Sequence, residues 1–289
     1  MANPKADPSI YYVPDNGWYP VFIALGIMLM LTGLGTWLNH TKAGEDGSWV
    51  QSLVGVAIFS VVVFLWFSKV IQENFAGMAN PQLKRSYVWG MSWFIFSEVM
   101  FFSAFFGALF YARQLSLPWL GDLEHKLLWP DFTAVWPSAG PAFKDVFTPM
   151  GAWGIPAINT LLLLTSGVTL TFAHFALIKN NRSHLILWMI ATIALGALFL
   201  SLQIYEYSHA YAELNLKLTT GIYGSTFFML TGFHGFHVTV GAIMLTVILF
   251  RCIAGHFKPD HHFAFEAVAW YWHFVDVVWL LLFVVVYWL

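Results

Sequence analysis

Several titratable side chains lie within long apolar stretches of this sequence. A charged group inside a membrane costs about 2.5–3.5 kcal/mol on insertion scales, so such residues usually have a partner and a purpose. Carboxyl and imidazole groups in this setting relay protons, ligate a metal ion or haem, or form hydrogen bonds between helices. The residues in question are Glu98, His234, His237, Glu266, His273 and Asp276.

His234 and His237 are three residues apart in the stretch 232–237 (GFHGFH). On a helix this spacing places two ring nitrogens on one arc, where they could share a metal ion. The alternative is that the imidazoles form interhelical hydrogen bonds, with the nearby glycines allowing a second helix to approach closely. We favour the second interpretation and expect this chain to bind no metal and no haem.

A second group of titratable residues lies near the C-terminus. Helical periodicity places Glu266 and His273 on one face, and His262 extends that face by one turn. Together with Asp276 these residues resemble an acid–base triad, but no nucleophile accompanies them. We therefore expect no catalytic residue, and we expect His261 and His262 to contact lipid headgroups or to cap a helix.

Glu98 lies in the stretch 97–102 (SEVMFF), near the middle of an apolar run. It could relay protons, serve as a structural carboxyl, or face a bound lipid. A relay needs other titratable groups at the same depth, whereas phenylalanines flank Glu98 in the sequence. We favour the structural or lipid-facing interpretation. The flanking residues are Phe94, Phe96, Phe101, Phe102, Phe105 and Phe106.

The composition indicates which kind of element carries these residues. Of 289 residues, 59% are hydrophobic and 10% are charged, whereas soluble domains average about 45–50% apolar and about 25% charged residues. These values exclude a soluble globular enzyme, and 28 Phe with 15 Trp exclude a disordered chain. A formal net charge of -2 without a basic run excludes nucleic acid as a partner. A single cysteine, Cys252, excludes an intrachain disulfide and cysteine-rich metal sites.

Seven stretches reach the roughly 20 apolar residues that cross a bilayer. Their continuous apolarity predicts an all-α polytopic membrane protein rather than a β-barrel. The connection 113–154 contains five prolines and is expected to form an ordered outer cap, not a further span. The predicted spans cover residues 20–38, 49–71, 87–112, 155–178, 184–205, 220–250 and 265–289.

The distribution of Lys and Arg predicts the orientation of these spans. Eight Lys and Arg residues lie on the same side of the membrane as the N-terminus, and five lie on the other side. We therefore expect the N-terminus on the inner side of the membrane and the C-terminus on the outer side. The start of the chain lacks a basic flank before an apolar core, so no cleavable signal peptide is expected. The eight are Lys5, Lys69, Lys84, Arg85, Lys179, Arg182, Arg251 and Lys258, and the five are Lys42, Arg113, Lys126, Lys144 and Lys217.

Long motifs in this sequence resemble a known family. The stretches 223–238 (YGSTFFMLTGFHGFHV) and 261–279 (HHFAFEAVAWYWHFVDVVW) are similar to subunit III of cytochrome c oxidase. The stretch 97–102 and the pair Ala173-His174 fit the same pattern in order and spacing. The similarity covers nearly the whole chain apart from the N-terminus and the 113–154 connection.

The resemblance implies a non-catalytic core subunit of a proton-pumping, aa3-type oxidase that takes electrons from cytochrome c. In this family haem A and copper belong to subunits I and II, so this chain would itself hold structural phospholipids only. The resemblance implies a single membrane domain, residues 1–289, with a two-helix bundle (1–75) and a five-helix bundle (76–289) around a lipid-filled cleft. The implied roles are to stabilise subunit I, to support its proton uptake and to offer oxygen a lipid-lined route.

The family's motifs also imply roles for individual residues. This sequence has Ser68 and Gln72 where arginines are usual and Gly107 where an aromatic residue is usual, so headgroup binding is expected to be weaker or of different lipid preference. The implied lipid contacts are Trp66, Glu73, Arg251, His261 and Phe263. The residues expected to be buried, polar and structural are Glu98, His174, His234, His237, Glu266, His273 and Asp276.

Two other functions stay open at this point. Subunit III of a quinol oxidase is the nearer one, although those relatives typically have five spans. A stand-alone proton-coupled transporter would use Glu98, His234 and His237, but no broken helix or inverted repeat is visible. The polar N-terminus and the long outer connection favour a bacterial plasma membrane over a mitochondrial inner membrane.

Overall fold

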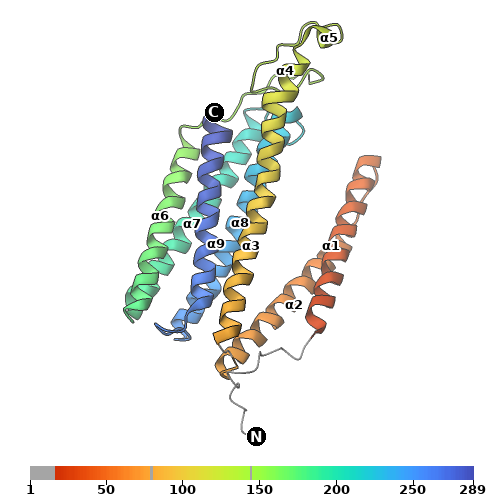
Figure 1. The fold of residues 1–289 in the computed structure, drawn as a ribbon. Helices are drawn as coiled ribbons and strands as arrows, with labels where there is room; N and C mark the ends of the chain where they lie inside the picture. The colour runs from red at the N-terminus through yellow and green to blue at the C-terminus, as the bar shows by residue number, and fades with distance from the viewer. Residues whose placement is uncertain (1–16, 79–80, 144) are drawn as a thin grey trace. The chain divides into compact units, whose positions relative to one another are not determined.

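The computed structural model describes residues 17–78, 81–143 and 145–289, and the regular elements in these ranges are helices. Seven of them are long and apolar enough to cross a membrane, which confirms the predicted all-α polytopic architecture (Figure 1). Lys5, Lys144 and the chain start, where no cleavable signal peptide is expected, lie outside the described residues. The long helices are α1 (Trp18–Ala43), α2 (Val50–Phe75), α3 (Pro81–Tyr111), α6 (Ile155–Ile178), α7 (Arg182–Ala212), α8 (Gly221–Ile253) and α9 (Phe263–Leu282).

The chain divides into two compact units, Met1–Trp89 and Gly90–Leu289. The predicted division after residue 75 and the predicted lipid-filled cleft stay predictions.

In the first unit α1 and α2 pack against each other through small residues. A Cβ atom at Gly33 would lie 2.6 Å from the backbone nitrogen of Ser52, and one at Gly55 would lie 2.7 Å from the carbonyl oxygen of Gly26. Membrane helices gain no hydrophobic free energy by leaving lipid for each other, so close backbone approach supplies the attraction. The hydroxyl of Ser52 donates to the carbonyl of Met30 at 3.1 Å and adds a polar contact between the two helices.

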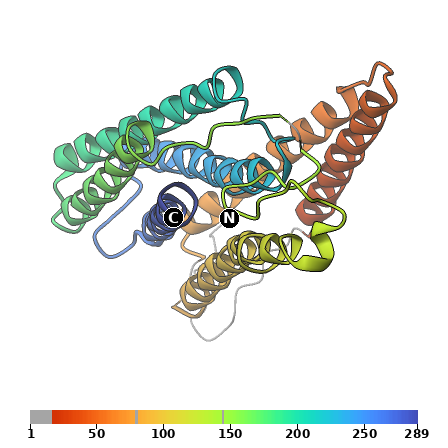
Figure 2. The same ribbon diagram turned by 90° about the horizontal axis from the view of Figure 1, so that it is seen from above.

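In the second unit four helices form a closed ring, because α6 and α8 each pack against both α7 and α9 (Figure 2). Trp272 of α9 fills the centre of this ring and is fully buried. Glycines make room for its indole, since a Cβ atom at Gly196 or at Gly241 would lie 2.8 Å from the ring. Its ring N–H donates to Ser166 Oγ at 2.9 Å, which satisfies the polar end of the side chain.

Helix α3 is attached to this ring by aromatic side chains rather than by close backbone approach. The ring centroids of Phe101 and Phe233 are 5.0 Å apart, and those of Phe94 and Tyr271 are 6.0 Å apart. Phe102 is 3% exposed and therefore lies within the core. The phenylalanines that flank Glu98 in the sequence thus include the contacts that hold α3 in place.

The third span is longer at both ends than the predicted stretch 87–112. It begins at Pro81, and after Tyr111 it continues through a π-helical turn (η1, Ala112–Ser116) into α4 (Leu117–Leu120). The predicted start of the connection at residue 113 was therefore wrong. Pro118 does not stop the helix: it follows the π-helical turn directly and lies in the first turn of α4.

The remainder of the connection, after α5 (Leu123–Lys126), is irregular but fastened to the helical core. The N–H of Thr148 donates to the carbonyl of Leu214 at 2.9 Å, and the amide of Asn215 donates to the carbonyl of Val146 at 3.1 Å. Trp136 packs edge-on against Tyr223 with centroids 5.5 Å apart. The connection is therefore tied to the start of α8 and to the segment before it. A second π-helical segment, η2 (Phe283–Trp288), ends the chain after α9.

Candidate functional site

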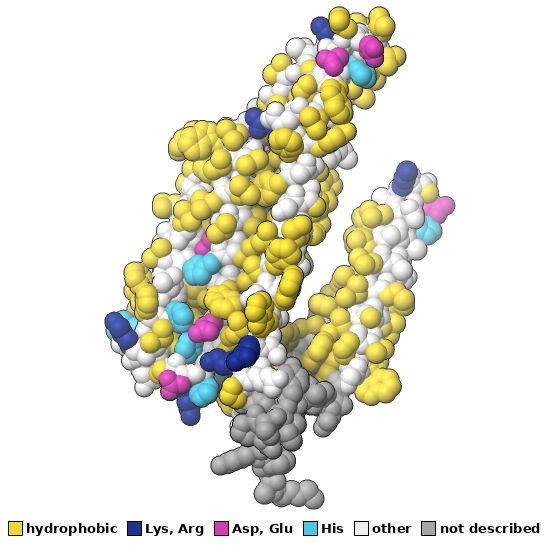
Figure 3. Space-filling view, viewed as in Figure 1, with side chains coloured by type: hydrophobic (Ala, Val, Ile, Leu, Met, Phe, Trp, Pro, Cys, Tyr) yellow, Lys and Arg dark blue, Asp and Glu magenta, His cyan; other side chains and the backbone are white. Residues whose placement is uncertain are grey.

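Titratable side chains gather on the face of the second unit that carries α6 and α9. Figure 3 shows histidine and acidic side chains there, surrounded by apolar ones. In the described residues these groups form close pairs and one cluster of three. Each pair or cluster connects two different helices or two successive turns of one helix.

Glu98 of α3 is paired with His237 of α8. Glu98 Oε2 lies 2.8 Å from His237 Nε2, and the side chains are 21% and 8% exposed. The other ring nitrogen of His237 lies 2.6 Å from the carbonyl oxygen of Phe233, which only accepts, so Nδ1 is the donor there. Nε2 is then the ring nitrogen that faces the carboxyl group of Glu98. The sequence placed both titratable residues within apolar runs, but it did not show that they pair.

His234, three residues before His237, has different surroundings. It is fully buried, with ring centroids 5.8 Å from Phe199 and 5.1 Å from Trp279. Neither ring nitrogen has a hydrogen-bond partner among the residues that the structure describes. The two imidazoles that the spacing placed on one arc therefore contact different groups.

The group predicted near the C-terminus is divided in the structure. His273 Nδ1 lies 3.7 Å from Asp276 Oδ2, one turn further along α9. Asp276 is 6% exposed and approaches α6 where Gly167 lacks a side chain, since a Cβ atom there would collide with Asp276 Oδ2. Glu266 instead contacts His262, with 3.1 Å between Oε1 and Nε2. The acid–base triad suggested by the spacing is thus two separate pairs.

His262 also meets His174 from α6. Their Nε2 atoms are 3.3 Å apart, although the residues are 88 positions apart in the sequence. With Glu266 they make a cluster of three possible metal ligands from two helices. From the sequence, His262 is expected to contact lipid headgroups or to cap a helix, and the structure places it directly before the first residue of α9.

One fully buried carboxyl group, Glu206, is not among the candidate residues named from the sequence. Its Oε1 accepts a hydrogen bond of 2.7 Å from the hydroxyl of Tyr287. Glu206 lies one residue beyond the predicted span 184–205, but α7 continues to Ala212, so the residue belongs to the helix. Gln203, one turn earlier, is also buried and donates to the carbonyl of Thr231 at 2.9 Å. The spacing of these two polar residues on one helical face was the signal available in the sequence.

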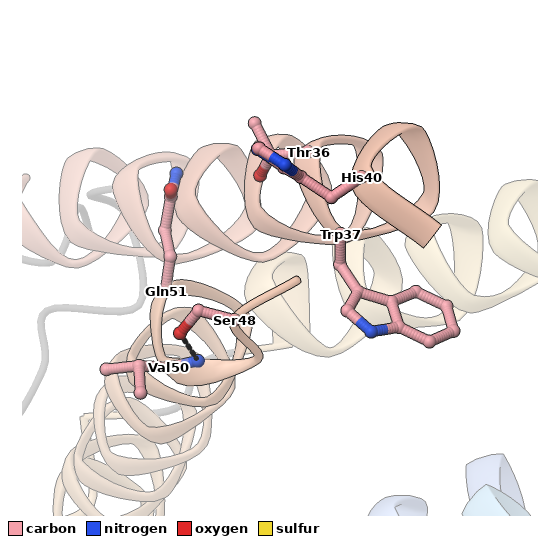
Figure 4. A pocket seen from close by; sticks show the side chains of 6 residues that line it. All are labelled: Thr36, Trp37, His40, Ser48, Val50 and Gln51. Carbon is pink, nitrogen blue, oxygen red and sulfur yellow. Dashed lines mark hydrogen bonds between the residues drawn. The ribbon is translucent and has the colours of Figure 1, made fainter. Parts of the chain in front are cut away.

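The residues implied to bind lipid are distributed over both units. In the first unit Trp66 stacks on Tyr19, with ring centroids 5.8 Å apart. Glu73 Oε1 lies 3.8 Å from Nζ of Lys69, one turn earlier on α2. A cavity of about 420 Å³ in this unit lies at the turn between α1 and α2 and is lined by Trp37, His40 and Gln51, among others (Figure 4). None of the implied lipid contacts lines it.

In the second unit Arg251 lies in the last turn of α8. Its guanidinium carbon is 4.6 Å from the ring centroid of Phe257, and its Nε has no partner among the described residues. His261 closes a backbone turn with Lys258, and Phe263 packs edge-on against Trp270 at 6.2 Å. These three residues therefore lie near the ends of α8 and α9 that the connection 254–262 joins.

Comparison with known proteins identifies the family. The family model described as cytochrome c oxidase subunit III matches residues 10–289. The chain is 38% identical over 279 residues to cytochrome c oxidase subunit 3 of Neotragus moschatus and of Gazella subgutturosa, covering 96% of this chain and 96% of each relative. The corresponding protein of Tragelaphus imberbis is 37% identical over the same length. The resemblance noted in the sequence is thereby confirmed, and the chain belongs to the cytochrome c oxidase subunit III family.

Proposed function

We propose that this chain is a non-catalytic core subunit of an aa3-type, proton-pumping cytochrome c oxidase. The observation that carries the proposal is the match to the subunit III family over residues 10–289. Haem A and copper are assigned to subunits I and II, and subunit I is the main partner. Dinuclear copper needs more than the single cysteine of this chain, and Cys252 is buried.

The pairing of the buried polar groups supports a structural role. Glu98 is hydrogen bonded to His237, and Glu206 to Tyr287, so each carboxyl joins two separate segments of the chain. An unpaired polar group in this setting costs about 1–3 kcal/mol, and such bonds fix how the helices pack. We assign these residues to the packing of a rigid subunit that stabilises subunit I and supports its proton uptake.

We further propose that the subunit binds phospholipids through residues in both units. The guanidinium of Arg251 lies in the last turn of α8, where a cation can pair with a lipid phosphate. His261 and Phe263 lie near Arg251, where the connection 254–262 joins α8 to α9. In the first unit, Trp66 of α2 provides an aromatic group and Glu73 of α2 a polar group for a lipid. Acyl chains held in this way would also offer oxygen an apolar route.

The proposed location is a bacterial plasma membrane with the N-terminus in the cytoplasm and the C-terminus in the periplasm. The seven long apolar helices support an integral membrane protein, and the Lys and Arg distribution supports this orientation.

The test of the proposal is the composition of the particle that carries this chain. The chain would be tagged, extracted from its native membrane in mild detergent and purified under conditions that keep complexes intact. We expect the particle to show the optical spectrum of haem A, the electron paramagnetic resonance signal of dinuclear copper, and oxidation of cytochrome c. A particle without haem A and copper would overturn the proposal, and haem A without dinuclear copper would indicate a quinol oxidase instead.

A further inference from the structure

Three possible metal ligands from α6 and α9 converge in the second unit. His262 Nε2 lies 3.3 Å from His174 Nε2 and 3.1 Å from a carboxylate oxygen of Glu266. One ligand atom from each residue lies within 4.8 Å of the others, and all three residues are partly buried. In the described ranges no other group of three His, Cys, Asp or Glu side chains gathers in this way.

The positions of these side chains are fixed by the local fold. His262 precedes the first residue of α9, and Glu266 follows one turn later on the same helical face. A turn closed by the N–H of His261 donating to the carbonyl of Lys258 at 3.0 Å leads into this helix start. The His174 ring packs on the fully buried Phe265 with centroids 5.5 Å apart. The cluster is therefore built into the junction of two helices.

The hydrogen bonds of His262 leave a lone pair directed into the cluster. Its Nδ1 lies 3.2 Å from the carbonyl oxygen of Lys258, and a carbonyl only accepts, so Nδ1 carries the hydrogen. In a neutral imidazole the Nε2 atom is then a bare acceptor, and it faces the carboxylate of Glu266. Two acceptors 3.1 Å apart repel each other unless a proton or a metal cation lies with them.

We propose that His174, His262 and Glu266 form a binding site for a divalent transition metal ion, with Zn²⁺ as the best match. Ligands about 2.0–2.1 Å from a tetrahedral zinc ion are about 3.3 Å from each other, close to the 3.3 Å and 3.1 Å separations found here. Two neutral imidazoles and one carboxylate are a common ligand set for zinc and leave a fourth position for water. A ligating histidine normally donates its other N–H to a carbonyl or carboxylate, as His262 does. The bound ion would join the end of α6 to the start of α9.

The alternative to a metal ion is a proton held by the same three groups. A measurement of zinc binding distinguishes a metal site from a protonated cluster. The assembled complex that contains this chain would be washed with a chelator, equilibrated with zinc at a fixed low free concentration, and analysed for retained zinc. The matched variants are His262→Gln and Glu266→Gln, which remove one ligand each. The control is His184→Gln, which changes an exposed histidine in the first turn of α7.

We expect wild type and His184→Gln to retain about one zinc ion per complex more than His262→Gln, and Glu266→Gln to bind zinc at least tenfold more weakly. We expect the zinc X-ray absorption spectrum of wild type, after subtraction of the His262→Gln spectrum, to show two imidazole ligands. Equal zinc content in wild type and both ligand variants would overturn the proposal, and so would bound zinc with an unchanged absorption spectrum in His262→Gln. Because zinc content is measured per assembled complex, a variant that fails to assemble is replaced by His174→Gln, for which the same loss is expected. The result does not depend on which redox cofactors the partner subunits hold.

Discussion

At the scale of single residues, two carboxyl groups in the helical core, Glu98 and Glu206, are each paired with a residue from a distant part of the sequence. Glu98 and His237 are 139 positions apart, and Glu206 and Tyr287 are 81 apart. The types and depths of Glu98 and His237 were visible in the sequence. Their pairing was not, because helical periodicity determines which face a residue occupies but not which helix covers that face.

Replacing Glu98 tests whether it is a packing group or a proton relay. In Glu98→Gln the amide N–H₂ still donates to His237 Nε2, so assembly and the number of protons pumped per electron should be unchanged in reconstituted vesicles. Glu98→Leu leaves that nitrogen unpaired, which should destabilise the subunit by about 1–3 kcal/mol. We expect the subunit to leave the complex at a lower temperature than in wild type. Ser97→Ala, next in the chain and exposed, is the control. Loss of pumping in Glu98→Gln with normal assembly would make Glu98 a relay.

Replacing Tyr287 tests the pair that the sequence analysis missed. Tyr287→Phe removes the hydrogen bond that the hydroxyl donates to the fully buried carboxyl of Glu206, and it adds no steric strain. We expect a loss of about 1–3 kcal/mol, seen as a lower temperature at which the subunit leaves the complex. Tyr205→Phe on the same helix is the control, since Tyr205 is 61% exposed. Equal stability of the two variants would show that the Glu206 bond contributes nothing.

Arg251 is the residue on which the proposed lipid contact depends most. Arg251→Ala should lower the anionic phospholipid retained per purified complex and shorten the working life of the enzyme, while the initial turnover rate stays close to wild type. Mass spectrometry of extracted lipid and the decay of oxygen uptake during sustained turnover measure the two effects. Lys258→Ala, a cation in the following connection, is the comparison. Unchanged lipid content and lifetime in Arg251→Ala would contradict the proposed contact.

At the scale of helices, the seven spans could be predicted because each is a long apolar run, and α6 was placed at its observed bounds, residues 155–178. The ends of other helices could not, because helical hydrogen bonds continue into polar residues such as Lys84 and Glu206. Pro118 likewise marks the start of a new helical turn instead of the end of the helix. Apolarity reports the part of a helix that lies in lipid, whereas its ends are set by the neighbouring segments.

The packing of α1 on α2 gives a prediction at this scale. A Cβ atom at Gly55 would collide with the backbone of α1, whereas none of the described atoms lies within 4 Å of one at Gly35. Gly55→Ala should therefore force the two helices apart and destabilise the subunit by about 1–3 kcal/mol. Gly35→Ala should leave stability equal or slightly higher, since alanine favours helix. Thermal release of the subunit from the complex measures both, and equal behaviour would contradict the close packing.

At the scale of the whole molecule, the composition predicted the membrane class and the motifs predicted the family, and both were confirmed. What they could not predict is how the helices of the second unit close into a ring around Trp272. That arrangement brings His174 of α6 to His262 at the start of α9, and it places α3 against α8 through phenylalanines. Such contacts depend on three-dimensional neighbours, which neither hydropathy nor spacing specifies.

The central claim is that this subunit stabilises an oxidase whose redox centres lie in other chains. The most direct measurement compares the intact complex with the same complex after detergent has removed this chain. We predict the same amounts of haem A and copper per remaining particle, a similar initial rate of oxygen reduction, and a several-fold faster loss of activity during turnover. Loss of haem A or copper in proportion to the removed chain, or an undiminished lifetime without it, would contradict the account.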